Sequence, residues 1–177
     1  MIGVKASVVA EYIADALSVK LVPMVVGSPG VGKSAIVRQV AEEFGLKVID
    51  LRLSQCDPTD LLGLPSVNAE GRSTYAPMDT FPLVGDEIPK GFSGWLLFLD
   101  EFNSAPISVQ AAAYKLTLDR MVGLHNLHSN VLICCAGNRD TDGAIVQRMS
   151  TANQSRLIHI DVQLDTKDWM DFAQNNG

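Results

Sequence analysis

Two hydrophobic patterns alternate along the chain, and their order predicts an α/β protein. Continuous apolar runs of strand length are typical of strands that a parallel sheet buries on both faces. Such runs lie at 21–26, 95–99 and 131–136, and two further strands are predicted at 46–53 and 156–162. Apolar residues at helical spacing predict intervening helices, which lie at 4–19, 35–44 and 106–119. Strands that alternate with helices predict a three-layer αβα sandwich around a five-stranded parallel sheet.

The segment between the first strand and the following helix has the sequence GSPGVGKS, Gly27–Ser34. It fits the pattern G-x-x-x-x-G-K-[ST] of a phosphate-binding loop and has the strand–turn–helix context that this loop requires. Its glycines let backbone N–H groups point into one concavity at a helix N-terminus, where the helix dipole favours an anion. We expect Lys33 to reach the β- and γ-phosphates of a nucleoside triphosphate and Ser34 to ligate Mg²⁺. The residues predicted to surround the phosphates are Gly27, Ser28, Pro29, Gly30, Val31, Gly32, Lys33, Ser34 and Ala35.

Two other predicted strands end in polar side chains. Asp100 and Glu101 follow the run 95–99 directly, and ligands bind at the carboxyl ends of strands in open α/β sheets. We expect Asp100 to hold Mg²⁺ through its water shell and Glu101 to polarise an attacking water. Asn138 follows the run 131–136, where its amide can hydrogen-bond the γ-phosphate or the water. A turn-forming Asn after Gly137 is the alternative interpretation.

The stretch between the second and third strands is richer in Gly, Pro and Ser than the rest of the chain. Asp57 and Pro58 predict the N-cap and first residue of a short helix. Residues 63–94 are interpreted as an insertion that projects from the core, with a hairpin around Asn68–Gly71. Short helices are also predicted at 143–149 and after Thr166.

Composition narrows the class of protein. The 177 residues predict one domain, or one domain plus a fragment. The 14 basic and 20 acidic residues give a net charge of −6, which argues against a basic nucleic-acid track over the whole surface but not against a local basic rim. Cys134 and Cys135 lie in an apolar run and are expected to be buried free thiols. No apolar stretch reaches the length of a membrane span and no signal peptide opens the sequence, so a cytoplasmic location is expected. The three histidines show no metal-ligand spacing and are expected to have packing or surface roles.

The ordered set GSPGVGKS, LLFLDEFN, ICCAGN and SRLIHI resembles the P-loop NTPases of the AAA+ class, most closely their MoxR-like branch. The resemblance spans nearly the whole chain. It matches Lys33 and Ser34 to Walker A, Asp100 and Glu101 to Walker B, and Asn138 to sensor 1. Asn103 falls on the DE-x-N pattern common in MoxR-like proteins.

The resemblance also implies an arginine finger, a residue that reaches the nucleotide of the neighbouring subunit. Arg156, just before the fifth strand, matches its place; Arg148 is the second candidate and Arg139 the third. A surface ion pair is the alternative for each of them.

The resemblance implies ATP and Mg²⁺ as cofactors and a homo-oligomer, in full-length relatives a hexameric ring. It also accounts for residues 63–94, because MoxR-like proteins carry a β-hairpin insertion in the second helix region, which commonly engages a partner or lines the central pore. A von Willebrand factor A protein is a possible partner. The family usually adds a helical lid, and the sequence ends before one could form, so the chain is expected to be an AAA+ core over 1–177 whose lid is missing or truncated.

The leading hypothesis is a Mg²⁺-dependent ATP hydrolase that works as a ring and remodels or loads a protein partner. One alternative is a nucleotide-gated binding module with negligible turnover, against which the intact Asp100–Glu101 pair argues. Another is a nucleic-acid translocase with the same core, which the acidic balance disfavours. The client, the ring size and the preference for ATP over other triphosphates stay open.

Overall fold

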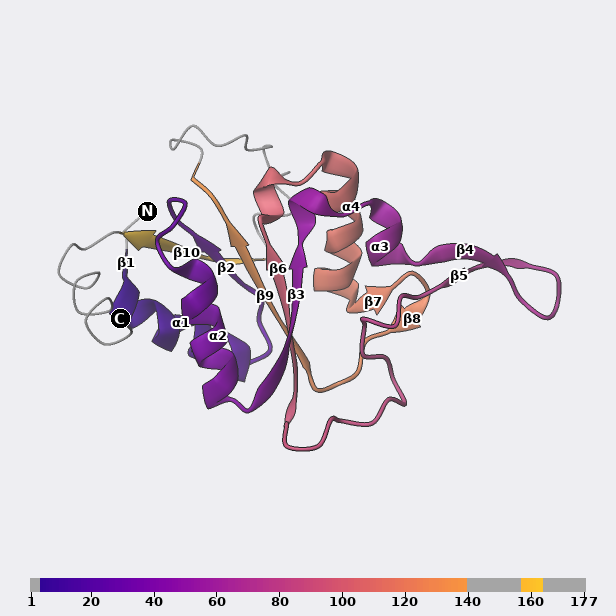
Figure 1. Ribbon diagram of the computed structural model, residues 1–177, viewed down its shortest axis with the longest axis horizontal. Helices are drawn as coiled ribbons and strands as arrows, with labels where there is room; N and C mark the ends of the chain where they lie inside the picture. Colours follow the sequence, from indigo (N-terminus) through magenta and orange to yellow (C-terminus); the bar gives the residue numbers. More distant parts are fainter. Residues whose placement is uncertain (1–3, 140–156, 164–177) are drawn as a thin grey trace.

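A parallel sheet forms the centre of the molecule (Figure 1). The computed structural model describes residues 4–139 and 157–163. The sheet has six strands in the order β1-β10-β2-β9-β6-β3, and every neighbouring pair is parallel. These strands are β1 (Val4–Lys5), β2 (Pro23–Val26), β3 (Leu46–Arg52), β6 (Gly94–Asp100), β9 (Val131–Gly137) and β10 (Ile158–Gln163).

Five of these strands are those that the sequence predicts, so the five-stranded parallel sheet is confirmed. The sixth, β1, has two residues and was not predicted. It pairs with the end of β10 through Val4–Val162 and Lys5–Gln163. The helix that the sequence predicts from residue 4 therefore begins at Ala6, after this short strand.

Helices cover both faces of the sheet, which confirms the three-layer sandwich. The helices of the main body are α1 (Ala6–Ser18), α2 (Lys33–Glu43), α3 (Pro58–Leu62) and α4 (Ile107–Tyr114). Those on one face, α1 and α2, pack over a buried cluster that includes Leu96 and Phe98, and α3 and α4 pack over a cluster that includes Leu97 and Leu99. Successive residues of β6 thus enter opposite cores, and burial on both faces explains why this strand is continuously apolar.

Two of the predicted helices differ in detail from expectation. The stripe predicted along the first helix is Val8, Val9, Tyr12, Ile13, Ala16 and Leu17. Most of these side chains pack against the sheet, but that of Tyr12 is 47% exposed. The helix predicted over 106–119 is α-helical to Tyr114 and then widens into a π-helical segment, η3 (Lys115–Asp119), in which Leu116 and Thr117 are both buried.

A hairpin extends from the sheet domain at the right of Figure 1. It consists of β4 (Leu64–Val67) and β5 (Ser73–Ala76), which pair antiparallel around a turn that Asn68 closes by accepting the Glu70 and Arg72 N–H groups. The predicted hairpin is therefore confirmed. Before it, Asp57 caps α3 with a capping box and Pro58 occupies the first turn, as predicted.

Only part of the stretch 63–94 projects. Residues after the hairpin return to the body, where Phe81 is buried and Leu83 forms a β-bridge with Leu127. This return lies beside a second small hairpin, which consists of β7 (Met121–Val122) and β8 (His125–Asn126). None of the helices in the described ranges is long and apolar enough to cross a membrane.

Gly63 joins α3 to the projecting hairpin and requires the absence of a side chain. Its φ of 93° and ψ of 169° belong to a region that only glycine occupies readily, and a Cβ would lie 2.4 Å from the Ala76 carbonyl oxygen. We expect Gly63→Ala to lower the free energy of unfolding by roughly 3 kcal/mol. The control is Gly71→Ala, which has a φ of 74° but open space around its Cβ and is expected to cost about 1 kcal/mol. Denaturant unfolding followed by circular dichroism measures both, and equal losses would contradict the steric argument.

Candidate functional site

The loop between β2 and α2 curls around the side chain of its own lysine. Gly32 lies immediately before α2 with a φ of 88°, which a glycine adopts without strain. Lys33, the first residue of α2, is 8% exposed, and its Nζ donates to the carbonyl oxygens of Gly27 at 2.8 Å and Ser28 at 3.0 Å. A helix leaves its first N–H groups without intrahelical partners, and its dipole is positive at this end. The loop therefore presents an ammonium group and a helix N-terminus at one place.

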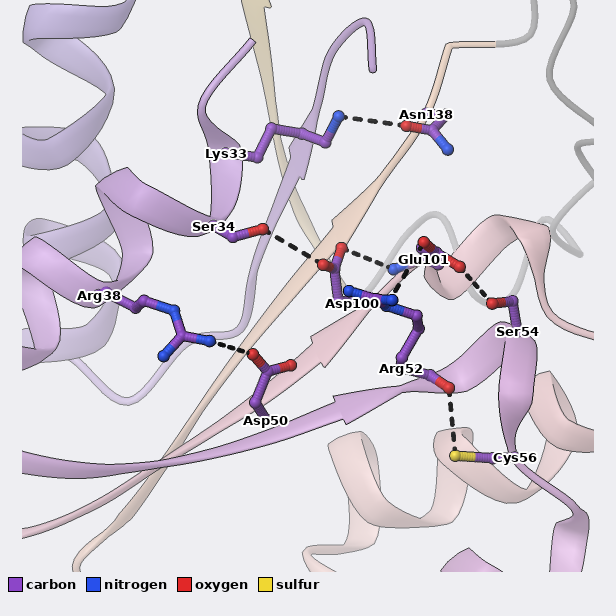
Figure 2. Close-up of polar contacts among 10 residues, drawn as sticks. All are labelled: Lys33, Ser34, Arg38, Asp50, Arg52, Ser54, Cys56, Asp100, Glu101 and Asn138. Carbon is purple, nitrogen blue, oxygen red and sulfur yellow. Dashed lines mark hydrogen bonds and ion pairs between the residues drawn. The ribbon is translucent and has the colours of Figure 1, made fainter. Parts of the chain in front are cut away.

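The tips of two more strands meet this loop (Figure 2). The Ser34 hydroxyl donates to Asp100 Oδ2 at 3.2 Å at the end of β6, and Lys33 Nζ donates to Asn138 Oδ1 at 3.2 Å just beyond β9. Because β2, β6 and β9 are parallel, their carboxyl ends lie at one edge of the sheet. The structure thus brings together Lys33, Ser34, Asp100 and Asn138, which the sequence placed on three separate segments.

Glu101 turns the chain away from the sheet at this edge. Its backbone has a φ of 54° and a ψ of 35°, a left-handed conformation unusual for a residue with a side chain. Its N–H donates to Asp100 Oδ1 at 2.8 Å. Glu101 follows Asp100 directly, so the turn keeps both carboxylates at the strand tip.

Two side chains contact the Glu101 carboxylate, one at the end of the neighbouring strand β3 and one just after it, and the sequence interpretation missed both. The Ser54 hydroxyl donates to one carboxylate oxygen, and Arg52 Nε lies 3.6 Å from the other. Arg52 ends β3 opposite Asp100 in the sheet register, and Ser54 lies in the short 3-10 helix η1 (Leu53–Gln55) that follows. Their position at the end of the strand predicted over 46–53 is the sequence feature that could have indicated a place near the site. The Arg52–Glu101 pair is largely exposed, so Ser54 is the firmer of the two contacts.

Of the three arginine-finger candidates, only Arg139 lies within the described residues; Arg148 and Arg156 do not. The Arg139 guanidinium donates from Nε to Asp161 Oδ1 at 2.8 Å and from Nη2 to the Val162 carbonyl at 2.5 Å. These contacts bind it to β10 of its own chain, as the ion-pair alternative predicts. The helices predicted at 143–149 and after Thr166 also lie outside the described residues.

The donors at the strand tips fit a magnesium ion. Mg²⁺ prefers oxygen ligands, keeps several waters and is commonly held by one or two protein groups together with substrate phosphates. The Ser34 hydroxyl and the Asp100 carboxylate are such donors and already lie within hydrogen-bond distance of each other. Among the described residues no group of three or more His, Cys, Asp or Glu side chains could hold a metal ion, so a site here would need oxygens from water or substrate.

Cys134 and Cys135 are buried free thiols, as predicted. Burial raises the pKa of both thiols well above the ordinary value, and the nearby Asp100 charge raises that of Cys134 further. Both thiols therefore stay protonated and unreactive behind the site.

This fold and this loop define a P-loop nucleotide-binding protein with the αβα architecture of NTPases. A family profile described as "ATPase family associated with various cellular activities (AAA)" matches residues 23–160. The chain belongs to this AAA family of ATPases. A search of curated proteins found no match.

Solved structures share the fold. A crystal structure of a candidate ATPase from Cytophaga hutchinsonii superposes with a TM-score of 0.68 at 17% identity, covering 97% of this chain and 51% of that one. NtrX from Brucella abortus superposes with a TM-score of 0.54 at 17% identity, covering 92% of this chain and 38% of that one. The chain therefore spans about half the length of the first of these proteins and less of the second.

Proposed function

We propose that this chain is the core of a Mg²⁺-dependent ATP hydrolase. One observation carries the proposal: Lys33 and Ser34 of the loop reach Asn138 and Asp100 at two other strand tips, each across 3.2 Å. An ammonium, a hydroxyl, a carboxylate and an amide converge at a helix N-terminus. This set suits a triphosphate and its metal ion, and membership of the AAA family supports it.

Each residue has a distinct role in the proposal. Lys33 neutralises charge on the β- and γ-phosphates, and Asn138, already bonded to Lys33, donates its amide to the γ-phosphate or the attacking water. Ser34 and Asp100 hold Mg²⁺, which when bound neutralises charge that develops on the phosphates. Glu101 orients and polarises the water. Ser54 and Arg52 each engage one oxygen of this carboxylate, and each oxygen keeps a further lone pair with which it can accept from that water.

We further propose that the protein is MoxR-like and works as a homo-oligomeric ring on a protein partner. The DE-x-N sequence at Asp100–Asn103 and the hairpin β4–β5 after α3 support this assignment. AAA domains commonly assemble into rings, and in a ring Arg156 is the proposed finger on the neighbouring subunit's nucleotide. A cytoplasmic location, a hexameric state and a von Willebrand factor A partner belong to the same proposal.

A nucleotide-gated binding module with negligible turnover is the second candidate. It is favoured by the engagement of Glu101, whose carboxylate is bonded to Ser54 rather than held open. In such a module this contact would hold the carboxylate where it cannot meet the attacking water.

Phosphate release from ATP separates the two candidates. We expect release that requires Mg²⁺ and a rate per chain that rises with protein concentration, because a finger supplied by a neighbour is worth ~10³–10⁵ in rate in related systems. The measurement is a phosphate-release assay with and without chelator over a wide range of protein concentrations. ATP binding without release would favour the module, and rapid release per chain that is unchanged on dilution would count against a shared site.

A further inference from the structure

Asn103 is a buried polar residue to which the proposed function assigns no role. It lies two residues after Glu101 in the 3-10 helix η2 (Phe102–Ser104) and is 6% exposed. Its side-chain amide makes two hydrogen bonds with the backbone of one residue. Asn103 Nδ2 donates to the Asn138 carbonyl oxygen at 2.6 Å, and the Asn138 N–H donates to Asn103 Oδ1 at 3.0 Å.

These two bonds take the place of a missing strand partner. The β6–β9 ladder ends at the pair Leu99–Cys135, because the left-handed turn at Glu101 takes the chain away from β9. The backbone of Asn138 lies three residues beyond the end of that ladder. The Asn103 amide carries one donor and one acceptor side by side, as a peptide group does, and it pairs with Asn138 where the β6 backbone no longer can.

Gly137, the residue before Asn138, allows the Asn103 amide to lie this close to the backbone of β9. A Cβ on Gly137 would lie 2.4 Å from Asn103 Oδ1 and 2.6 Å from Met24 Cε. No other residue at position 137 leaves room for the Asn103 amide at its present place. On the opposite side, the Gly27 N–H donates to the Gly137 carbonyl at 3.3 Å, so the tip of β9 is held between the phosphate loop and Asn103.

We propose that Asn103 is a positioning residue that fixes Asn138 relative to Glu101, an inference that rests on the proposed ATP hydrolysis. Asn103 follows Glu101 within one short turn, in which the Ser104 N–H donates to the Glu101 carbonyl at 3.0 Å. Asn103 therefore links the segment that carries Glu101 to the backbone of Asn138, whose side chain accepts from Lys33. Loss of the link lets Asn138 move relative to Glu101 while the phosphate loop and Ser34 stay in place.

The test is Asn103→Asp, which keeps the shape and the acceptor but replaces the Nδ2 donor by an oxygen facing the Asn138 carbonyl. We expect kcat for ATP hydrolysis to fall roughly 10- to 100-fold, because small misplacements of reacting groups have effects of this size. KM for ATP should change by no more than about 3-fold, since the loop contacts that bind the phosphates remain. Asn103→Ala, which adds no charge, is the second variant and should also lower kcat.

Gln110→Glu is the matched control. Gln110 is 4% exposed, lies in α4, and donates from Nε2 to the Ala105 carbonyl at 3.0 Å. The substitution therefore also exchanges a buried amide donor for an oxygen, but without contact to Asn138. We expect it to lower the unfolding temperature as Asn103→Asp does and to leave kcat within about 3-fold of the unmodified protein.

A double-mutant cycle tests whether Asn103 acts through Asn138. In the Asn138→Ala background, Asn103→Asp should lower kcat by much less than it does alone. If the effects of the two substitutions on kcat are fully additive, Asn103 does not act through Asn138, and the positioning role is overturned. An unchanged kcat in either Asn103 variant, provided that it folds, overturns it as well. Neither result contradicts ATP hydrolysis by the unmodified protein. If the unmodified protein releases no phosphate, the proposed function fails first and the inference fails with it.

Discussion

Replacing Glu101 by Gln is expected to leave ATP bound and to slow its hydrolysis by roughly 10²–10⁴-fold, the contribution of a positioned general base. The amide keeps the size of the side chain and an oxygen that Ser54 can still donate to. It cannot take a proton from water. Glutamine has the same backbone requirements as glutamate, so the left-handed turn at φ 54° costs no more than before. Equilibrium ATP binding and phosphate release, measured on the same preparation, give the two quantities.

The control for Glu101→Gln is Glu42→Gln, which makes the same change of charge on the exposed side of α2. It should leave both binding and hydrolysis unchanged. If Glu101→Gln hydrolyses ATP at the rate of the unmodified protein, Glu101 is not the general base, and another group must activate the water.

The strands and the phosphate loop could be predicted because their signals are local. Residues 95–99 are continuously apolar since β6 is buried on both faces, and GSPGVGKS has its chemistry within eight consecutive positions. The convergence of Asp100 and Asn138 on the phosphate loop, at Ser34 and Lys33 respectively, also followed from the sequence, because parallel strands place their carboxyl ends at one edge of the sheet. The geometry of these side chains is as expected, while their roles in hydrolysis stay predictions.

The residues around Glu101 could not be predicted in the same way. Ser54 and Arg52 contact it only because β3 is the strand beside β6, and no periodicity in the sequence gives the order of strands in the sheet. The segment after β5 was likewise taken as part of a projecting insertion. Two of its apolar residues return to the body: Phe81 enters the buried core cluster, and Leu83 forms a β-bridge with Leu127, which is distant in sequence.

The contacts of the Asn103 side chain could not be predicted from the local sequence pattern. The sequence placed it in a DE-x-N motif, which says nothing about what its amide contacts. The left-handed turn at Glu101 brings it against Asn138, and the sequence does not predict that turn, because glutamate rarely adopts a left-handed backbone conformation.

Replacing Lys33 by Met is expected to weaken ATP binding by roughly 100-fold or more. Methionine keeps most of the length of the side chain, so the buried stem still packs, but the ammonium group is lost. Hydrogen bonds to charged groups contribute about 1.5–3 kcal/mol each, and loss of about 3 kcal/mol of phosphate binding corresponds to more than a hundredfold in affinity. Titration of the protein with a fluorescent ATP analogue measures the change.

The ammonium also supports the loop itself, since it donates to the carbonyls of Gly27 and Ser28 and to Asn138. Unfolding temperature must therefore be measured beside affinity, so that collapse of the loop is distinguished from loss of charge. Lys47→Met on the exposed side of β3 makes the same change of charge and should leave ATP affinity within about 3-fold. If folded Lys33→Met binds ATP as the unmodified protein does, the phosphates do not lie at this loop. The convergence of Asp100, Glu101 and Asn138 at this edge of the sheet would then no longer indicate a triphosphate site.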